Sequence, residues 1–389
     1  MSNNNRIMQW IFCGLSYILV AALASFATLF FLPQPEGNGK LNELQALIQN
    51  RFVGEVTDTQ LYDGAAAGMV AATGDKWSYY IPASEYASHM EQVQNAYVGI
   101  GVTVSTVEGE DMFTVLAVEP GSGAAEAGIL AGDKICEVEG KSATELGADG
   151  TKALIRGDEN TTVNLTVLRD EEKLAFTVTR KRIQVIVAKG EMLPDNIGLV
   201  SIKNFDERCA DETLAAIDSL LEQGAKALIF DVRFNPGGFK TELVEILDYL
   251  LPEGPVFRSI SYTGDETVTY SDAEHLDIPM AVLMNDASYS AAEFFAAALS
   301  EYDKAVVVGE ATTGKSYFQN TFRLSDGSAV GLSVGKYCTP NGVSLAEVGG
   351  LKPDVEVLVD EDMWYNLYAG TVAPSEDPQI QAAIAQLQQ

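Results

Sequence analysis

Residues 227–238 read ALIFDVRFNPGG, and this stretch decides the fold. Its first half is a short apolar run typical of a buried β-strand. Its second half is a turn with two glycines, after which a helical pattern, FKTELVEILDYLL, begins at residue 239. The same order of strand, turn and helix recurs at 280–302, and a further apolar strand lies at 305–310. This alternation predicts an α/β fold with at least partly parallel strands.

The regions on either side of this α/β pattern read differently. Residues 97–180 are short β-rich runs separated by Gly, Asp, Glu and Asn, which predicts a small β-domain. Apolar residues with helical spacing occur at 41–52, and a small-residue helix is expected at 63–72. An amphipathic helix follows Asp377-Pro378. We therefore divide the chain into a transmembrane segment at 7–32, a linker and helical region at 33–94, a β-domain at 95–181, an α/β core at 182–358 and a helical tail at 359–389.

The N-terminal segment 7–32 contains no Asp, Glu, Lys or Arg. A helix of that length spans the hydrocarbon core of a bilayer. Arg6 precedes it and acidic residues follow it, which favours a single-pass anchor in the cell membrane with the remainder of the chain extracytoplasmic. A cleaved signal peptide is the competing interpretation, because Ala22-Leu23-Ala24 fits a cleavage site. The apolar run continues for eight residues beyond Ala24, which favours the uncleaved anchor.

Composition excludes several classes of function. Acidic residues outnumber basic ones 55 to 25, for a net charge of −30, so a nucleic-acid partner is not expected. The four cysteines are too few for a disulfide scaffold. Only two histidines, His89 and His275, are present, and neither lies in a metal-binding motif. No metal and no organic cofactor are predicted.

Two of the strand-to-helix turns carry groups suited to acyl-transfer chemistry. Gly237 and Gly238 let backbone N–H groups face a bound oxyanion, although an ordinary turn has the same composition. Residues 285–293 read NDASYSAAE and lead into a helix. A serine at such a helix start can present its Oγ as a nucleophile, although a capping serine has the same sequence.

The third turn supplies a candidate base. Lys315 follows the strand at 305–310, and burial would lower its pKa towards neutrality, so that it could replace histidine as the base. Gln319 lies four residues later and could orient the lysine by hydrogen bonding. A solvated loop lysine is the alternative. Residues 309–316 also match the phosphate-binding pattern GxxxxGKS, but the segment after Lys315 looks extended, whereas a P-loop requires a helix there.

The β-domain opens with a turn bounded by glycines, YVGIGV at 97–102. Such a turn can present backbone N–H groups to the terminal carboxylate of a peptide, while the adjacent strand edge pairs with the peptide backbone. The candidate peptide-binding residues are Val98, Gly99, Ile100, Gly101 and Val102.

Together these segments resemble the carboxy-terminal processing peptidases, serine proteases of the membrane or cell envelope with an inserted PDZ domain. The resemblance extends from about residue 41 to the C-terminus. It is carried by DGAAAGMVAATGDKWSYYIPASEY at 63–86, YVGIGV at 97–102, VEPGSGAAEAGILAGDKICEVEG at 118–140, DVRFNPGG at 231–238, NDASYSAAE at 285–293, VVVGEATTGKSYFQ at 306–319 and YCTPNG at 337–342.

The resemblance implies a role for each candidate residue. Ser290, rather than Ser288, would be the nucleophile, Lys315 the general base and Gln319 the residue that orients the lysine. The Ala291 N–H and the N–H of one of Gly237 or Gly238 would form the oxyanion hole. The core would have a crotonase-like α/β fold. The PDZ domain would bind protein substrates by non-polar C-terminal tails, in a groove that includes the helix near residues 152–155, and would gate activity.

The sequence departs from the family pattern at three positions. Phe234 replaces the usual Asn, Tyr289 replaces the small residue before the nucleophile, and Ser316 replaces the glycine after the lysine. Bulky side chains at 234 and 289 are expected to reshape the substrate pocket or slow acylation. They keep open a second hypothesis, a non-catalytic PDZ scaffold that binds C-terminal peptides. The oligomeric state, including a homo-oligomer, is left open by the sequence.

Overall fold

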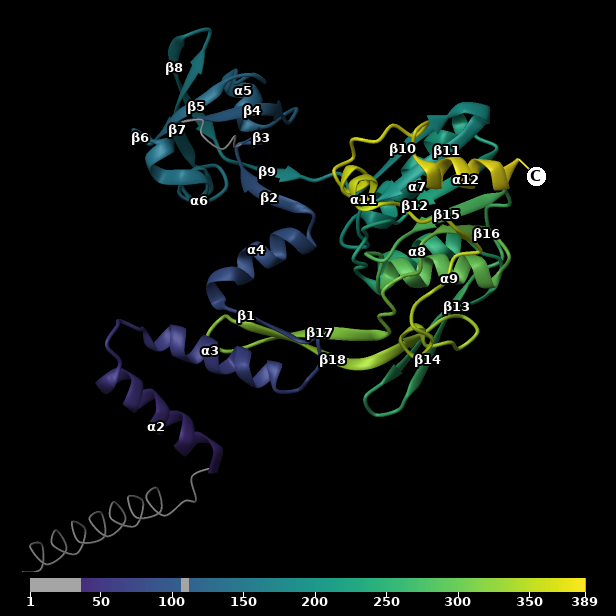
Figure 1. Cartoon of the computed structure of the whole chain (residues 1–389), viewed down its shortest axis with the longest axis horizontal. Helices are drawn as coiled ribbons and strands as arrows, with labels where there is room; N and C mark the ends of the chain where they lie inside the picture. The colour runs from purple at the N-terminus through teal and green to yellow at the C-terminus, as the bar shows by residue number, and fades with distance from the viewer. Residues whose placement is uncertain (1–35, 106–111, 389) are drawn as a thin grey trace, which may run out of the picture. The chain divides into compact units, whose positions relative to one another are not determined.

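The computed structural model describes residues 36–105 and 112–388 (Figure 1). The predicted transmembrane segment at 7–32 lies outside these residues. Within the described ranges, no helix combines the length and the apolar character needed to cross a bilayer. The chain divides into two compact units, Met1–Met69 and Val70–Gln389.

The described part of the N-terminal unit contains two helices, α2 (Glu36–Arg51) and α3 (Asp58–Ala71). The second helix extends two residues past the end of the unit at Met69. Gln45 joins them, because its Nε2 donates to Asp58 Oδ1 at 3.0 Å and its Oε1 accepts from the Tyr62 hydroxyl at 3.0 Å. Both helices fall where the sequence predicts them, and α3 begins five residues earlier than expected.

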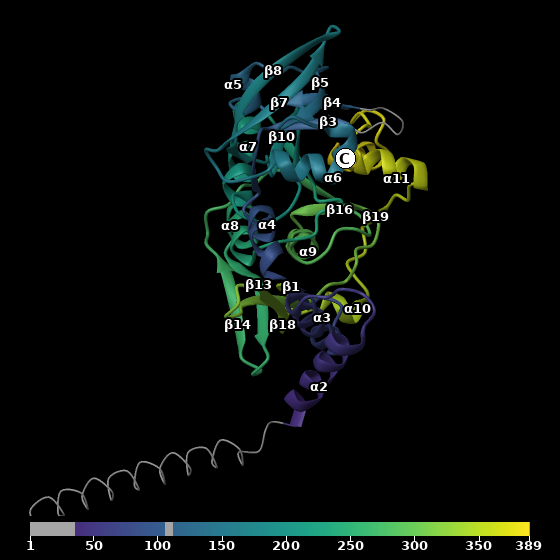
Figure 2. The ribbon, with the colours of Figure 1, turned by 90° about the vertical axis from the view of Figure 1, so that its left-hand side faces the viewer.

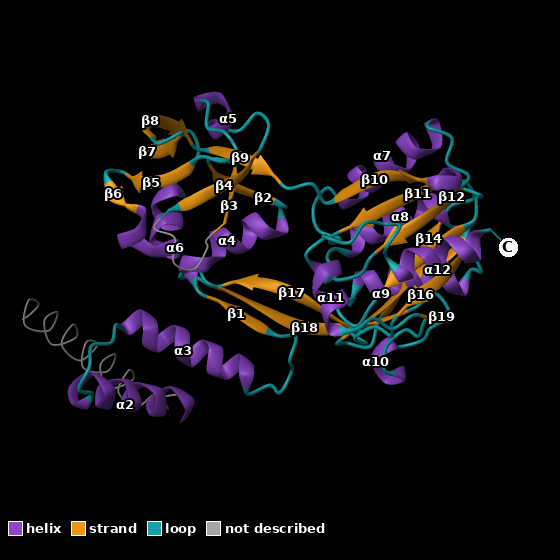
Figure 3. Ribbon diagram, turned by 45° about the horizontal axis from the view of Figure 1, so that its top comes forward, coloured by secondary structure: helices purple, strands orange, loops and turns teal. Residues whose placement is uncertain are grey.

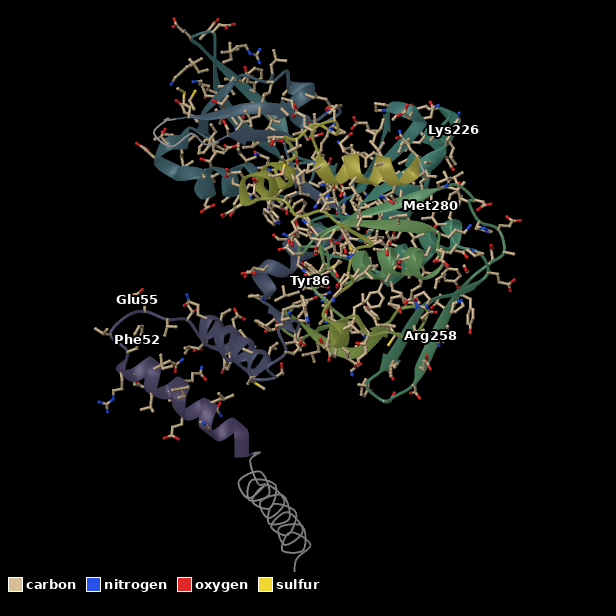
Figure 4. All side chains as sticks on the ribbon, turned by 45° about the vertical axis from the view of Figure 1, so that its right-hand side comes forward. Phe52, Glu55, Tyr86, Lys226, Arg258 and Met280 are labelled. Carbon is tan, nitrogen blue, oxygen red and sulfur yellow. The ribbon has the colours of Figure 1, made fainter. Side chains whose placement is uncertain are left out.

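The core of the second unit is a six-stranded sheet with the order β10-β11-β12-β15-β16-β19. The strands are β10 (Ala188–Leu193), β11 (Ile197–Ile202), β12 (Ala227–Asp231), β15 (Met280–Met284), β16 (Ala305–Gly309) and β19 (Val355–Glu356). All neighbouring pairs are parallel except β10 with β11. Figure 4 labels Lys226 and Met280, which mark where β12 and β15 begin. The opposite edge, where the parallel strands end, carries the candidate site.

Both faces of this sheet are covered by helices, as Figure 3 shows with strands in orange and helices in purple. The helices are α7 (Cys209–Glu222), α8 (Lys240–Leu250), α9 (Ala291–Glu301) and α12 (Pro378–Leu387). Successive strand residues point to opposite faces. Leu228 and Phe230 therefore pack in the core that contains α7, α8 and α9, whereas Ile229 packs in the core that contains Ile380 and Ala383 of α12. Burial on both faces explains why β12 reads as a continuous apolar run.

A second sheet has the order β1-β18-β13-β14, with β17 also paired to β18 (Figure 2). Its strands are β1 (Tyr79–Ile81), β13 (Gly254–Ser261), β14 (Glu266–Ser271), β17 (Tyr317–Arg323) and β18 (Ala329–Cys338). Tyr79 is opposite Gly331, so this sheet brings the segment around residue 77 next to the strands that follow Lys315. The segment after Lys315 is a strand, as predicted, so the P-loop pattern lacks the helix that it requires.

The β-domain has its own apolar core, which includes Ile100, Val115, Ile135, Leu165 and Val167. Its strands are β2 (Ala96–Gly99), β3 (Val102–Ser105), β4 (Phe113–Val118), β5 (Lys134–Val138), β6 (Lys141–Ser142), β7 (Thr162–Arg169), β8 (Glu172–Thr179) and β9 (Lys181–Gln184), with helices α5 (Gly123–Ala127) and α6 (Ala143–Ile155). Strands β2 and β9, the first and the last of the domain along the chain, pair with each other.

Arg208 binds both connections to the β-domain. Its Nη2 donates to the carbonyl oxygens of Asn95 and Val185, each at 2.8 Å. Its Nη1 forms an ion pair with Glu212 at 3.0 Å. The remaining elements are α4 (Ala83–Val93), the short 3-10 helix η1 (Pro194–Asn196), α10 (Leu345–Val348) and α11 (Glu361–Tyr368).

Candidate active site

Three turns meet where the parallel strands end. The first joins β12 to α8 and contains Gly237 and Gly238, the second joins β15 to α9 and contains Ser290, and the third joins β16 to β17 and contains Lys315. The carboxyl ends of neighbouring parallel strands lie at one edge of a sheet, so the order β12-β15-β16 places these turns side by side. The structure thus brings together the core residues that the sequence singles out.

Ser290 stands at the start of α9 in a sharply turned conformation. Its φ is 58° and its ψ is −125°, values that are unfavourable for a residue with a side chain. The Ser290 N–H donates to Glu293 Oε2 at 2.9 Å, which helps to hold the turn. Ser290 is 7% exposed, so its access to solvent is narrow.

Ser288, two residues earlier, has a structural role. It is fully buried, and its Oγ donates to the Val232 carbonyl at 2.8 Å. The Asn285 N–H in turn donates to Ser288 Oγ at 3.0 Å. This hydroxyl therefore ties the Ser290 turn to the strand that leads to the glycine turn.

Gly237 lies directly against Ser290. A Cβ built on Gly237 would lie 2.7 Å from Ser290 Cβ and 2.8 Å from Ala291 N, so a larger residue is excluded there. The Gly237 N–H donates to Asn235 Oδ1 at 2.8 Å. Among the hydrogen bonds found within the described residues, none is donated by the N–H of Gly238 or of Ala291.

Lys315 lies partly buried between two aromatic side chains. Its Nζ is 4.6 Å from the centroid of the Trp77 ring and 5.7 Å from that of the Tyr289 ring. Burial lowers the pKa of Lys315, while the charges of Asp75 and Glu293 partly oppose this shift. No hydrogen bond joins Lys315 Nζ to Ser290 among the described residues.

Gln319 is held by other partners. Its Nε2 donates to Ser333 Oγ at 2.9 Å and to the Tyr317 carbonyl at 3.1 Å. It lies at an irregularity in the pairing of β17 with β18, between Phe318 and Gln319. The side-chain amide of Gln319, a residue of β17, therefore contacts Ser333 of β18, and no described hydrogen bond joins it to Lys315. Its role in orienting the lysine stays a prediction.

Glu293 links the Ser290 turn to the Lys315 turn. Its carboxylate is fully buried and accepts hydrogen bonds from the backbone N–H groups of Ser290 at 2.9 Å, Gly314 at 2.6 Å and Lys315 at 2.8 Å, and also from the Thr312 hydroxyl. Burial raises the pKa of Glu293, and these hydrogen bonds oppose the shift. Glu293 was not among the residues predicted from the sequence to have a role, although the pattern Ser-x-x-Glu at a helix start is a signal of this kind of contact.

The three departures from the family pattern occupy defined places. Phe234 has a φ of 59° and packs edge-on against Trp364 and Tyr368 of α11, with centroids 4.9 and 5.5 Å apart. Ser316 is fully buried, and its Oγ accepts from the Ala346 N–H at 2.9 Å. Tyr289 contributes a ring beside Lys315.

A buried arginine holds the strand that leads to the glycine turn. Arg233 forms ion pairs with Asp231 at 2.6 Å and with Asp377 at 2.8 Å, and it donates to Gln379 Oε1 at 2.9 Å. Although burial disfavours the cation, Asp231 and Asp377 raise the pKa of Arg233, so the guanidinium stays charged. The C-terminal helix α12 is thereby joined to the catalytic edge of the sheet.

The candidate peptide-binding residues line one cavity in the β-domain. The cavity has a volume of about 470 Å³, and its walls include 97–102 together with Lys152 and Ile155 of α6. Gly101 has a φ of 77°, and a Cβ there would lie 2.3 Å from Ser122 Cβ, so the turn requires glycine. In the described part of the chain, no group of three or more His, Cys, Asp or Glu side chains is placed to hold a metal ion.

Comparison with known proteins assigns three regions of the chain to families. Residues 196–357 match the model of peptidase family S41, residues 98–179 match the PDZ domain, and residues 33–85 match the N-terminal domain of the activating protease CtpB. The carboxy-terminal processing protease CtpA of Bacillus subtilis (strain 168) is 33% identical over 356 residues, which cover 87% of this chain and 75% of that protein. A probable CtpA-like serine protease of Staphylococcus aureus is 29% identical, over 92% of this chain and 74% of its own.

Solved structures share the fold. A putative S41 protease from Bacteroides fragilis matches with a TM-score of 0.53 at 18% sequence identity, over 86% of this chain and 92% of that one. The two expected modules, a PDZ domain and an S41 protease core within an α/β fold, are thereby confirmed. The chain belongs to peptidase family S41, among the carboxy-terminal processing proteases, and is a serine-type peptidase.

Proposed function

We propose that the chain is a membrane-anchored endopeptidase that cleaves proteins near non-polar C-termini through a dyad of Ser290 and Lys315. Ser290 Oγ attacks the scissile carbonyl, and the neutral amine of Lys315 takes the hydroxyl proton and later delivers it to the leaving amine. The N–H groups of Gly238 and Ala291 bind the oxyanion. Support for these two donors comes from Gly237, whose own N–H is occupied by Asn235.

The observation that carries this proposal is the carboxylate of Glu293. It accepts the backbone N–H of both Ser290 and Lys315, so one buried group fixes the backbone of both dyad residues. A purely structural capping residue would hold only its own helix start. Catalysis by a nucleophile and a base requires that their relative position be held closely, and this contact does so.

The lysine suits the role of a base because burial lowers its pKa. Only the neutral amine can accept the serine proton, so activity should rise as pH increases through the pKa of Lys315. Asp75 and Glu293 favour the protonated form, and the working pH reflects the balance between these charges and burial.

The PDZ domain is proposed to bind the tail of the protein substrate and to gate activity. The cavity at residues 97–102 has an apolar side formed by Ile100, Val102 and Ile155, which fits a non-polar C-terminal side chain. The segment at 7–32 is proposed to anchor the protein in the cell membrane with the catalytic core outside the cytoplasm, on the strength of its length and lack of charge.

A non-catalytic PDZ scaffold is the second candidate. It is favoured by the position of Lys315 Nζ over the Trp77 and Tyr289 rings rather than at Ser290, and by the contact of Gln319 with Ser333. A scaffold would retain the cavity at residues 97–102 and bind tails without cutting them.

The test uses the full chain in detergent, together with Ser290→Ala, Lys315→Met and the surface control Lys336→Met. Each is incubated with an unstructured protein that ends in a non-polar tail, and the products are weighed by mass spectrometry. We expect cleavage by the wild type and by Lys336→Met, and a loss of at least about 10³-fold in the other two variants. Binding of the tail without cleavage by the wild type would support the scaffold. Equal cleavage by Ser290→Ala would show that Ser290 is not the nucleophile.

A further inference from the structure

The amine of Lys315 is surrounded by rings from two distant parts of the chain. Trp77 precedes β1, and Tyr289 immediately precedes Ser290. Their ring centroids are 5.7 Å apart with an interplanar angle of 33°, and Lys315 Nζ lies within 6 Å of both. An ammonium group at this distance from an aromatic face is attracted by the electrons of the ring. We call Trp77 and Tyr289 the aromatic cradle.

We propose that the aromatic cradle binds the protonated side chain of Lys315 and holds it away from Ser290, so that Trp77 and Tyr289 are positioning residues that set the pH at which the base becomes available. The inference rests on the proposed function of Lys315 as the base. It differs from that function because it assigns a role to two residues that take no part in proton transfer. The neutral amine is not attracted by the rings in this way, so deprotonation releases Lys315 towards Ser290.

The cradle itself is firmly placed. The backbone N–H of Trp77 donates to Asp75 Oδ1 at 3.1 Å. The Ser78 hydroxyl donates to Asp75 Oδ2 at 2.6 Å and accepts from the Ser333 N–H at 3.1 Å, which ties this segment to β18. On the other side, the Tyr289 N–H donates to the Asn235 carbonyl at 3.1 Å. The lysine, with its long flexible side chain, is therefore the member that can move.

Besides the aromatic cradle, three charged groups act on the charge of Lys315. The carboxylates of Asp75 and Glu293 favour the ammonium form, and burial opposes it. Lys76 places its Nζ 4.5 Å from the Trp77 ring centroid and competes for the same ring. Tyr289 is neutral at physiological pH, because burial raises the pKa of its hydroxyl. The ring attraction adds to that of the two carboxylates and raises the pH at which Lys315 becomes neutral.

The experiment replaces the ring with an apolar side chain that has no aromatic face. In the full chain, Trp77→Leu and Tyr289→Leu are compared with the wild type by the pH dependence of kcat/KM on an unstructured substrate. We expect the rising limb to move to lower pH by about one unit in Trp77→Leu, with a several-fold gain at a pH below the wild-type limb. Trp364→Leu is the matched control, because it removes an indole that packs on Phe234, and its limb should not move. The inference is overturned if the rising limb of the pH profile of Trp77→Leu stays in place or moves to higher pH.

A second readout does not depend on activity. In the Ser290→Ala background, the pKa of the Lys315 amine is measured by competitive acetylation with acetic anhydride and peptide mass spectrometry, with and without Trp77→Leu. A lower pKa in the double variant is expected, and an unchanged or higher pKa overturns the inference. The two proposals fail differently: an inactive wild type, or an active Ser290→Ala, contradicts the proposed function, whereas an unmoved limb in an active enzyme contradicts only the cradle.

Discussion

The Ser290 turn and the Lys315 turn lie at the same edge of the sheet but are held in different ways. Around Ser290, directional hydrogen bonds fix the structure: Ser288 Oγ donates to the Val232 carbonyl, and the Ser290 N–H donates to Glu293. Around Lys315, the backbone is equally fixed by Glu293, but the amine itself lies over aromatic rings. Ring contacts attract charge without prescribing one direction.

The backbone of both turns is fixed by hydrogen bonds, whereas the contacts of the Lys315 amine with the rings leave its direction less defined. The proposed nucleophile, Ser290, has a strained backbone, and its φ of 58° persists only because its neighbours enforce it. A base must approach, take a proton and deliver it, so a less directional environment suits it. The Glu293 carboxylate accepts hydrogen bonds from the backbone of both turns, so its substitution tests the difference between them first.

The largest effect is expected from Glu293→Gln. The amide keeps the size of the side chain but offers one oxygen where the carboxylate accepts four hydrogen bonds, so buried N–H groups lose their acceptor. We expect kcat/KM to fall by at least about 100-fold, together with a loss of about 3 kcal/mol in the free energy of unfolding. Steady-state kinetics and urea unfolding measure the two quantities.

Glu301→Gln is the control for this prediction. Glu301 ends the same helix, α9, and also accepts two hydrogen bonds, from Thr339 Oγ1 and the Asn341 N–H, but far along the helix from Ser290. It should change kcat/KM by no more than about threefold. Similar losses in both variants would mean that Glu293 acts only through the stability of α9.

A smaller effect is expected from Asp206→Asn, behind the glycine turn. A Cβ at Gly238 would lie 2.6 Å from Asp206 N, so this residue packs directly on the turn. Burial, with Glu242 and Glu207, raises the pKa of Asp206 to about 7. The pKa of an aspartate in the unfolded chain is about 3.9. Between that pH and the pKa in the folded state, the folded state holds a proton that the unfolded state has lost. The free energy of unfolding therefore falls as pH rises through this range.

The Asp206→Asn variant should lose this pH dependence. At pH 8 we expect it to be more stable than the wild type by on the order of 2 kcal/mol, with little difference at pH 4. Urea unfolding at both pH values measures this, and Asp211→Asn, at an exposed position in the first turn of α7, is the control. Equal stability of Asp206→Asn and wild type at pH 8 would contradict the assignment.

The smallest effect is expected from Phe234→Asn. Asparagine adopts a φ near 59° more readily than phenylalanine does, but the substitution loses the ring contacts with Trp364 and Tyr368. These terms oppose each other, so the free energy of unfolding should change by less than about 1 kcal/mol and kcat/KM by less than about threefold. A tenfold fall in kcat/KM would instead show that α11 positions the glycine turn.

The sequence predicted the sheet and its turns because that information is local. Apolar runs such as 227–231 and the glycines after them mark a buried strand and its turn without reference to the rest of the chain. The roles of Ser290, Lys315 and the glycine pair at 237–238 came instead from the resemblance to a family, because each turn read alone also fits an ordinary turn, a capping serine or a loop lysine.

Contacts between distant segments were not predictable in this way. Trp77 reaches Lys315 only because β1 pairs with β18, and a strand of three residues gives no signal of its partner. Gln319 was expected at Lys315, but its amide donates to Ser333 on the neighbouring strand β18, at a point where the pairing of β17 with β18 is irregular. Asp377 and Gln379 read as a helix start, and nothing local indicates that they bind Arg233.

The pairing of Arg233 with Asp377 also has a consequence for the order of biosynthesis. Arg233 leaves the ribosome long before its partners, since Gln379 follows it by 146 positions. Until then, the buried guanidinium has only Asp231 as a carboxylate partner, and the strand that leads to Gly238 lacks its final support. A growing chain therefore contains Ser290 and Lys315 before the segment that leads to Gly238 has all of its contacts.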